Sequence, residues 1–71
     1  MKINHYLKDD KKIWFINTGI SDWDHSERII EWCINQFGSE KYEFISWTFY
    51  NETFYFSELS DAILFLLTWE E

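Results

Sequence analysis

On either side of Asn51-Glu52, residues 45–57 alternate between apolar and hydroxyl-bearing side chains. This alternation restricts the fold more than any other feature. If Asn51 and Glu52 form a two-residue loop, Tyr50 pairs with Thr53 and the register of a β-hairpin is fixed. One face of the hairpin then collects Ile45, Trp47, Phe49, Phe54 and Phe56, and the other collects Ser46, Thr48, Tyr50, Thr53, Tyr55 and Ser57. Because Asn-Glu lacks the glycine of the favoured turns, a longer loop also fits.

A buried strand is expected at residues 12–17, where β-branched and aromatic residues follow one another. Residues 3–7 fit a further short strand, and the polar residues 8–11 between the two segments fit a turn. The N-terminal strand is therefore an optional addition to the sheet.

A first helix is predicted over residues 22–37. Ser21 and Asp24 fit the capping pattern of a hydroxyl followed by an acid three residues later, and Gly38 is the kind of residue that commonly ends a helix. Apolar residues recur at helical spacing in this segment. The expected core face is Ile29, Ile30, Cys33, Ile34 and Phe37.

A second helix is predicted over residues 58–69, opened by Ser57 or Ser60. Its expected core face is Leu59, Ala62, Ile63, Leu66 and Leu67, with Leu64 and Phe65 on opposite flanks. A helix that is apolar nearly all round is either buried on several sides or docked to another chain. Self-association through Leu64, Phe65 and Trp69 is one expectation for this helix.

These elements predict a single α+β domain over residues 1–71, with the order βαββα and both helices on one face of a three-stranded, mainly antiparallel sheet. With the third strand in the middle, the first pairs with it antiparallel and the arrangement is a ferredoxin-like unit without its final strand. A plain two- or four-stranded meander with two helices satisfies the same pattern. The expected aromatic core is Trp14, Phe15, Phe37, Trp47, Phe49, Phe54 and Phe56.

The aromatic content exceeds what this core uses. The 71 residues include five Trp, four Tyr and seven Phe, yet a chain of this size buries only about 60% of its unfolded surface. Some large rings should therefore reach the surface, where apolar patches commonly mark a partner site. The rings left over are chiefly Trp32, Tyr50, Tyr55 and Phe65.

The charge is divided unevenly along the chain. Residues 1–12 carry a net charge of +2 and residues 13–71 carry −9, which together give the net −7. The acidic body disfavours direct binding of nucleic acid and favours a protein partner with a basic surface. Solubility alone explains the same excess of acids.

No constellation of catalytic or cofactor-binding residues stands out. Residues 22–25 hold two Asp and a His, but acids at the start of a helix are explained by the helix dipole. Cys33 lies on the expected core face, and a buried structural cysteine is inert. The sequence therefore predicts a protein that is not an enzyme and has neither a cofactor nor a metal.

The sequence also indicates the cellular compartment in which the protein is expected. A single cysteine excludes an internal disulfide and is typical of a reducing cytoplasm. The most apolar stretch, residues 62–69, is far shorter than the about 20 residues that span a bilayer, so no membrane contact is expected.

The first helix carries the densest acidic surface. Asp24, Glu27 and Glu31 are spaced to form one stripe opposite the core face, and Trp32 lies beside it. Tryptophan next to charge is typical of interface hot spots, although Trp32 packed inside the domain fits the sequence as well. The predicted partner contacts are Asp24, Glu27, Glu31 and Trp32, with Tyr50 and Tyr55 second.

The C-terminal segment, residues 54–69, joins an aromatic strand to Asp61-Ala62 and then to Phe65-Leu66-Leu67-Thr68-Trp69. It resembles the ending of small proteins of tailed bacteriophages, which close with an Asp-Ala helix start and a Phe-x-Leu-x-Trp tail. The resemblance implies a viral protein in the host cytoplasm, an inhibitor of anti-CRISPR or anti-restriction type that contacts a bacterial defence or host protein. The alternative is a self-associating subunit, such as a homodimer, of a viral assembly.

Overall fold

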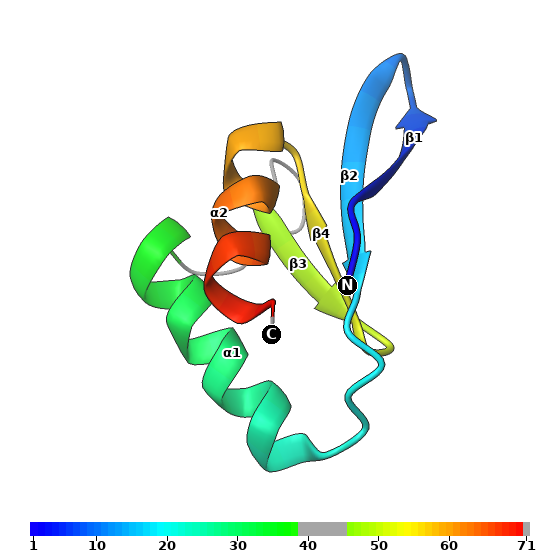
Figure 1. Ribbon diagram of the computed structural model, residues 1–71. Helices are drawn as coiled ribbons and strands as arrows, with labels where there is room; N and C mark the ends of the chain where they lie inside the picture. Colours follow the sequence, from blue (N-terminus) through cyan, green and yellow to red (C-terminus); the bar gives the residue numbers. More distant parts are fainter. Residues whose placement is uncertain (39–45, 71) are drawn as a thin grey trace.

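The computed structural model describes residues 1–38 and 46–70 and contains a four-stranded antiparallel sheet with two helices on one of its faces (Figure 1). The α+β class is confirmed, and the strand at the N-terminus makes the count four rather than three. In chain order the elements are β1 (Asn4–Lys8), β2 (Lys11–Asn17), α1 (Trp23–Phe37), β3 (Trp47–Tyr50), β4 (Thr53–Phe56) and α2 (Leu59–Trp69).

The sheet has the strand order β1-β2-β4-β3. The last strand in the chain, β4, therefore lies between β2 and β3 and is antiparallel to both. This is one of the arrangements that the sequence leaves open, and it excludes a plain meander. The β3–β4 register is also the predicted one, with Tyr50 opposite Thr53 and Trp47 opposite Phe56. Ile45, expected on the same face as Trp47, lies outside the described residues.

Two tight turns of the same kind close the two hairpins. Asn51 and Glu52 have φ angles of 50° and 64°, and Asp9 and Asp10 have 52° and 65°. Two successive positive φ angles are the signature of the turn whose twist matches antiparallel strands. The β3–β4 loop is thus two residues long, without the glycine that this turn favours.

The β1–β2 hairpin extends beyond the rest of the sheet. β2 pairs with β4 only from Trp14 to Asn17, whereas its pairing with β1 continues to Lys11 opposite Lys8. The end of the hairpin therefore projects past β4 (Figure 1).

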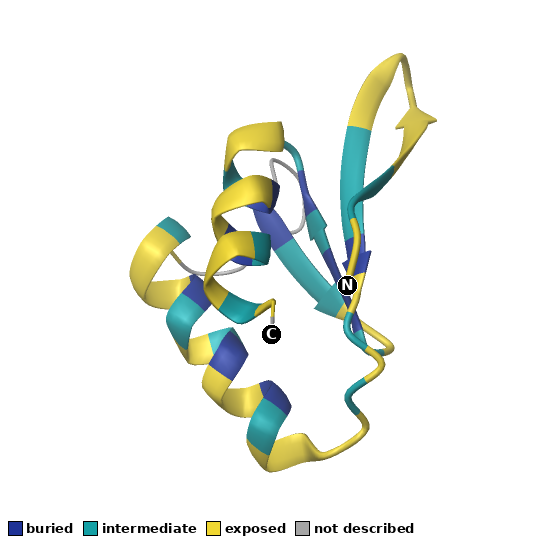
Figure 2. Ribbon diagram, in the orientation of Figure 1, coloured by how far each residue is buried: buried dark blue, intermediate teal, exposed yellow. Residues whose placement is uncertain are grey.

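The core lies between the sheet and the helices, and both layers contribute buried residues to it (dark blue in Figure 2). Aromatic rings fill most of this space. For example, Phe65 of α2 lies 4.9 Å from Phe54 and 5.4 Å from Phe56 between ring centroids. The fully buried apolar residues are Ile16, Ile29, Cys33, Trp47, Phe54, Phe56, Ala62 and Phe65.

Helix α1 begins one residue later than predicted. Asp22 is its N-cap, and its Oδ1 accepts a hydrogen bond from the backbone N–H of Asp24 at 3.3 Å, so Ser21 is not the cap. At the other end, the N–H of Gly38 donates to the carbonyl oxygen of Ile34 at 2.9 Å. Gly38 has a φ of 89°, which confirms its expected role in ending the helix.

The buried face of α1 is rotated from the predicted one. Ile29 and Cys33 are buried, but Ile34, predicted in the core, is 43% exposed. Successive helical residues are about 100° apart, so Ile34 and Trp32 lie on opposite sides of Cys33. Because α2 packs on the Trp32 side, the Ile34 side is left open.

The buried face of α2 differs more from the prediction. Phe65, expected on a flank, is completely buried, and Leu67, expected in the core, is 74% exposed. Leu59 and Ile63 are also exposed, so their predicted core positions are wrong. In a helix that is apolar nearly all round, hydropathy does not define the buried face, and here the ring of Phe65 fills the space above the sheet.

Neither helix of the described chain is long and apolar enough to cross a membrane.

Candidate functional site

Neither α1 nor α2 covers the opposite face of the sheet (Figure 1), and that face carries a cluster of aromatic rings. Tyr6 lies 5.8 Å from Phe15 and 6.5 Å from Tyr55, and Phe15 lies 6.0 Å from Tyr55, between ring centroids. Three adjacent strands therefore contribute one ring each. Tyr50, on β3, is 72% exposed on the same face by the register of the sheet.

The position of Phe15 corrects the predicted core. Trp14 and Ile16 stand opposite Phe56 and Phe54, which are buried beneath the helices. Side chains alternate along a strand, so Phe15 between them belongs to the open face. The continuous apolar run 13–16 within β2 hides this split, because it puts apolar side chains on both faces of the strand.

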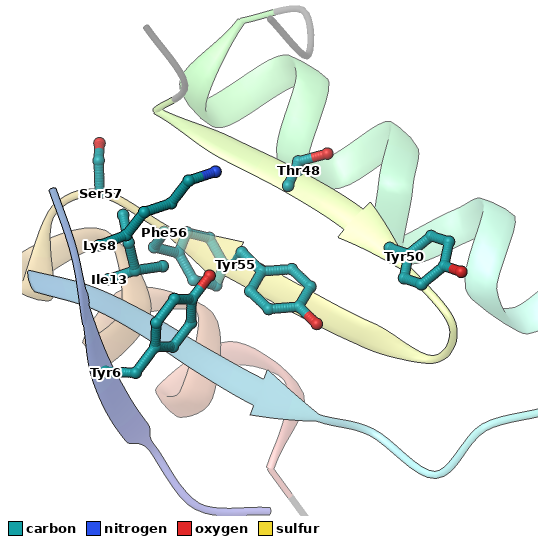
Figure 3. A pocket seen from close by; sticks show the side chains of 8 residues that line it. All are labelled: Tyr6, Lys8, Ile13, Thr48, Tyr50, Tyr55, Phe56 and Ser57. Atoms are coloured by element: carbon teal, nitrogen blue, oxygen red, sulfur yellow. The ribbon is translucent and has the colours of Figure 1, made fainter. Parts of the chain in front are cut away.

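A groove of about 230 Å³ lies on this open face, between the projecting β1–β2 hairpin and the β3–β4 hairpin (Figure 3). We call it the tyrosine groove. The Tyr6 ring and the Lys8 side chain extend from the hairpin on one side, and the Tyr55 ring lies on β4 beside them (Figure 3). The residues that line it are Tyr6, Lys8, Ile13, Thr48, Tyr50, Tyr55, Phe56 and Ser57.

The tyrosine groove differs in charge from the rest of the protein. Lys8 is the one charged residue among the eight described residues that line it. None of the acidic residues within 1–38 and 46–70 is in that lining. The groove is thus an aromatic surface with one positive charge on a protein with a net charge of −7.

The predicted contact surface on α1 is divided by the structure. Asp24, Glu27 and Glu31 are all exposed, as a solvent-facing stripe requires. Trp32, in contrast, is half-buried and makes edge contacts with the rings of Phe37, Phe65 and Trp69 at centroid distances of 5.6–6.0 Å. Its indole ring packs against α2, so most of it is a part of the helix interface.

A different tryptophan is exposed beside the acidic stripe. Trp23 is 61% exposed at the first position of α1. Because Glu27 and Glu31 follow it at intervals of four residues, all three lie on one side of the helix. Sequence reasoning missed Trp23, although its spacing from these acids is visible in the sequence.

The structure brings together the secondary predicted contacts, Tyr50 and Tyr55, on a surface away from the predicted contacts of α1. Both line the tyrosine groove, together with Tyr6 and Lys8, which were not predicted as contacts. A strand places positions 6 and 8 on one face, but the sequence of residues 4–8 has no alternation of apolar and polar side chains that marks this face. Since α1 lies against the other face of the sheet, the two predicted surfaces point in different directions.

Two titratable groups in the described residues have a shifted pKa, namely Cys33 and Asp61. Burial raises the pKa of the Cys33 thiol to about 12, which keeps it protonated and unreactive. Burial, and then the nearby Glu58 charge, raise the pKa of Asp61 at the start of α2. Among residues 1–38 and 46–70, no three His, Cys, Asp or Glu side chains are placed to hold a metal ion.

Comparison with family models, with curated proteins and with solved structures finds no match for this chain.

Proposed function

We propose that this chain is a small binding protein that acts by occupying a surface of another protein, with the tyrosine groove as its contact site. The observation that carries the proposal is the uncovered cluster of Tyr6, Phe15 and Tyr55 beside the exposed ring of Tyr50. Tyrosine gives a large, rigid contact area at a low cost in conformational entropy, together with a polar hydroxyl. Exposed aromatic patches of this kind are typical of interaction sites.

The class of partner rests on the sequence. The resemblance of residues 54–69 to the ends of small phage proteins supports a bacterial defence or host protein as the partner, with inhibition by occupancy as the outcome. No catalytic step is part of this proposal.

A second candidate is self-association, for which the outer surface of α2 is the relevant observation. Leu59, Ile63, Leu64 and Leu67 are all exposed there. Phe65 is completely buried within one chain, so it does not contribute to this surface. The candidate interface is therefore the aliphatic side of α2.

Capture from a bacterial lysate with quantitative mass spectrometry tests the proposal. The bait is the full chain, compared with the double variant Tyr50→Ser, Tyr55→Ser and with the matched triple variant Asp24→Asn, Glu27→Gln, Glu31→Gln. We expect one protein that the wild type and the triple variant retain and the tyrosine variant loses. Equal capture by all three folded baits would contradict the assignment of the groove.

A further inference from the structure

We infer that the tyrosine groove binds an acidic segment of a protein partner, with one aromatic side chain inserted between the tyrosine rings and carboxylates beside Lys8. The inference rests on the proposed function, because it specifies the chemistry of the partner at the same surface.

The size of the groove selects a single side chain. Its volume of about 230 Å³ is below the range of about 300–1,000 Å³ typical of pockets for whole small-molecule ligands. The groove is also built on a sheet surface, so a chain can run across it while one side chain enters. An extended peptide segment has that shape.

The walls of the groove select an aromatic side chain. Tyr6 meets Tyr55 edge to face, at an interplanar angle of 85°. Rings at such angles offer both a face and an edge to a further ring, and aromatic pairs gain stability beyond the area that they bury. Ile13 adds an apolar surface to the lining.

The charge of the groove selects acidic neighbours. Lys8 supplies a positive charge at the groove. The tyrosine hydroxyls can donate hydrogen bonds, and a carboxylate can accept them. A nucleic acid has the same two properties, rings and negative charge. One lysine on a chain of net charge −7 does not replace the several counterions that a polynucleotide releases on binding. A peptide segment with only one or two carboxylates beside its aromatic residue needs no more than that lysine, so it is favoured over a nucleic acid.

Titration of the 15N-labelled full chain with defined probes tests this inference. The main probe is a nine-residue peptide with a central tryptophan, one glutamate on each side of it and serines elsewhere. Three further probes replace the glutamates by lysines, replace the tryptophan by alanine, or are a nine-residue oligothymidylate. We expect saturable amide shifts at Tyr6, Lys8 and Tyr55 with the main probe and weaker binding of the other three.

A pair of charge variants on one hairpin provides the matched control. Lys8 stands opposite Lys11 in the register, so these two share one face of the hairpin. Lys12, the next residue, stands opposite Leu7 and lies on the opposite face. Lys8→Glu should weaken binding of the main probe by about fivefold or more, whereas Lys12→Glu, with the same change in net charge, should weaken it by less than about twofold. Equal losses would show non-specific attraction and overturn the inference.

The remaining outcomes separate the inference from the proposed function. Tighter binding of the lysine peptide, tighter binding of the oligothymidylate, or no saturable shift with any peptide would overturn the acidic occupant. If partner capture still depends on Tyr50 and Tyr55 in that case, the groove remains the contact surface and only the chemistry of its occupant is wrong. If capture does not depend on them, the proposed function fails as well.

Discussion

The indole Nε1 of Trp47 donates a hydrogen bond of 2.8 Å to the carbonyl oxygen of Gly38. This bond connects the residue that ends α1 to the first residue of β3, and the Trp47 side chain is buried against Phe54. The helix end and the sheet edge are therefore joined by the side chain that also fills the core. Trp69 offers a contrast, because its Nε1 is buried and has no hydrogen-bond partner among the described residues.

Conservative replacement of these two tryptophans should have unequal effects. Trp47→Phe removes buried area and leaves the Gly38 carbonyl without its donor, so we expect the free energy of unfolding to fall by about 2–3 kcal/mol. Trp69→Phe also removes ring area, but it eliminates a buried N–H whose desolvation is uncompensated. We expect it to change the free energy of unfolding by less than about 1 kcal/mol.

Urea unfolding followed by circular dichroism measures both variants. An equal loss for the two would show that the hydrogen bond to Gly38 contributes nothing beyond packing.

The β3–β4 turn predicts a stabilising substitution. Glu52 has a φ of 64°, a conformation that costs a residue with a side chain about 1–2 kcal/mol and costs glycine nothing of the kind. Its backbone carbonyl accepts hydrogen bonds from the N–H and the hydroxyl of Thr18 at 2.9 and 3.0 Å, and glycine keeps that carbonyl. Glu52→Gly should raise the free energy of unfolding by about 0.5–1 kcal/mol.

Thermal unfolding checks this value, with Glu52→Ala as the control. Alanine removes the same carboxylate but keeps the strain, so a matching gain from alanine would assign the effect to charge instead of backbone conformation.

The parts of the fold that were predicted correctly have alternating or punctuated sequences. The pairing of Phe49 with Phe54 follows from two opposite faces of different chemistry, and only one register keeps them apart. The positions of Gly38 and the two tight turns follow from local backbone chemistry. These signals lie within a few residues of the structure that they determine.

The parts that were not predicted depend on contacts between distant segments. Ile34 and Phe65 were misplaced because the apolar arcs of α1 and α2 are wider than the surface that each helix buries, and only their mutual packing selects which part is covered. The tyrosine groove exists because β1 and β4, about 50 residues apart in sequence, both pair with β2 and place Tyr6, Lys8 and Tyr55 on the same face of the sheet. Nothing local in either segment indicates that proximity.

The rotated face of α2 can be tested by two truncations. Phe65 is fully buried and Leu67 is largely exposed. Phe65→Ala should lower the free energy of unfolding by about 3–5 kcal/mol, and Leu67→Ala should change it by less than about 0.5 kcal/mol. If Phe65→Ala does not fold, Phe65→Leu gives a smaller loss that urea unfolding still resolves.

Sedimentation of the Leu67 variant also addresses self-association. A wild-type dimer that Leu67→Ala weakens would support the outer surface of α2 as an interface. A wild type that stays monomeric at high concentration would contradict it.

The Cys33 thiol predicts a loss of stability at alkaline pH. Its pKa rises from 9.0 to about 12 on burial, so between these values the unfolded chain loses the proton while the folded chain keeps it. The unfolded state is then favoured as pH rises above about 9, by up to about 1.4 kcal/mol per pH unit. We expect this part of the pH dependence to be absent in Cys33→Ala.

Denaturant unfolding between pH 8 and 10.5 makes the comparison, since other titrating groups are common to both proteins. Parallel curves for the wild type and Cys33→Ala would contradict burial of the thiol.

The most direct measurement of the central claim is site-specific photo-crosslinking of the full chain in bacteria. A benzophenone amino acid replaces either Tyr50, which lines the tyrosine groove, or Glu31, which lies on the acidic stripe of α1. Both residues are exposed. We predict one covalent adduct with a bacterial protein from position 50 and none with that protein from position 31. An adduct from position 31 and none from position 50 would place the partner on α1 and contradict the assignment of the groove.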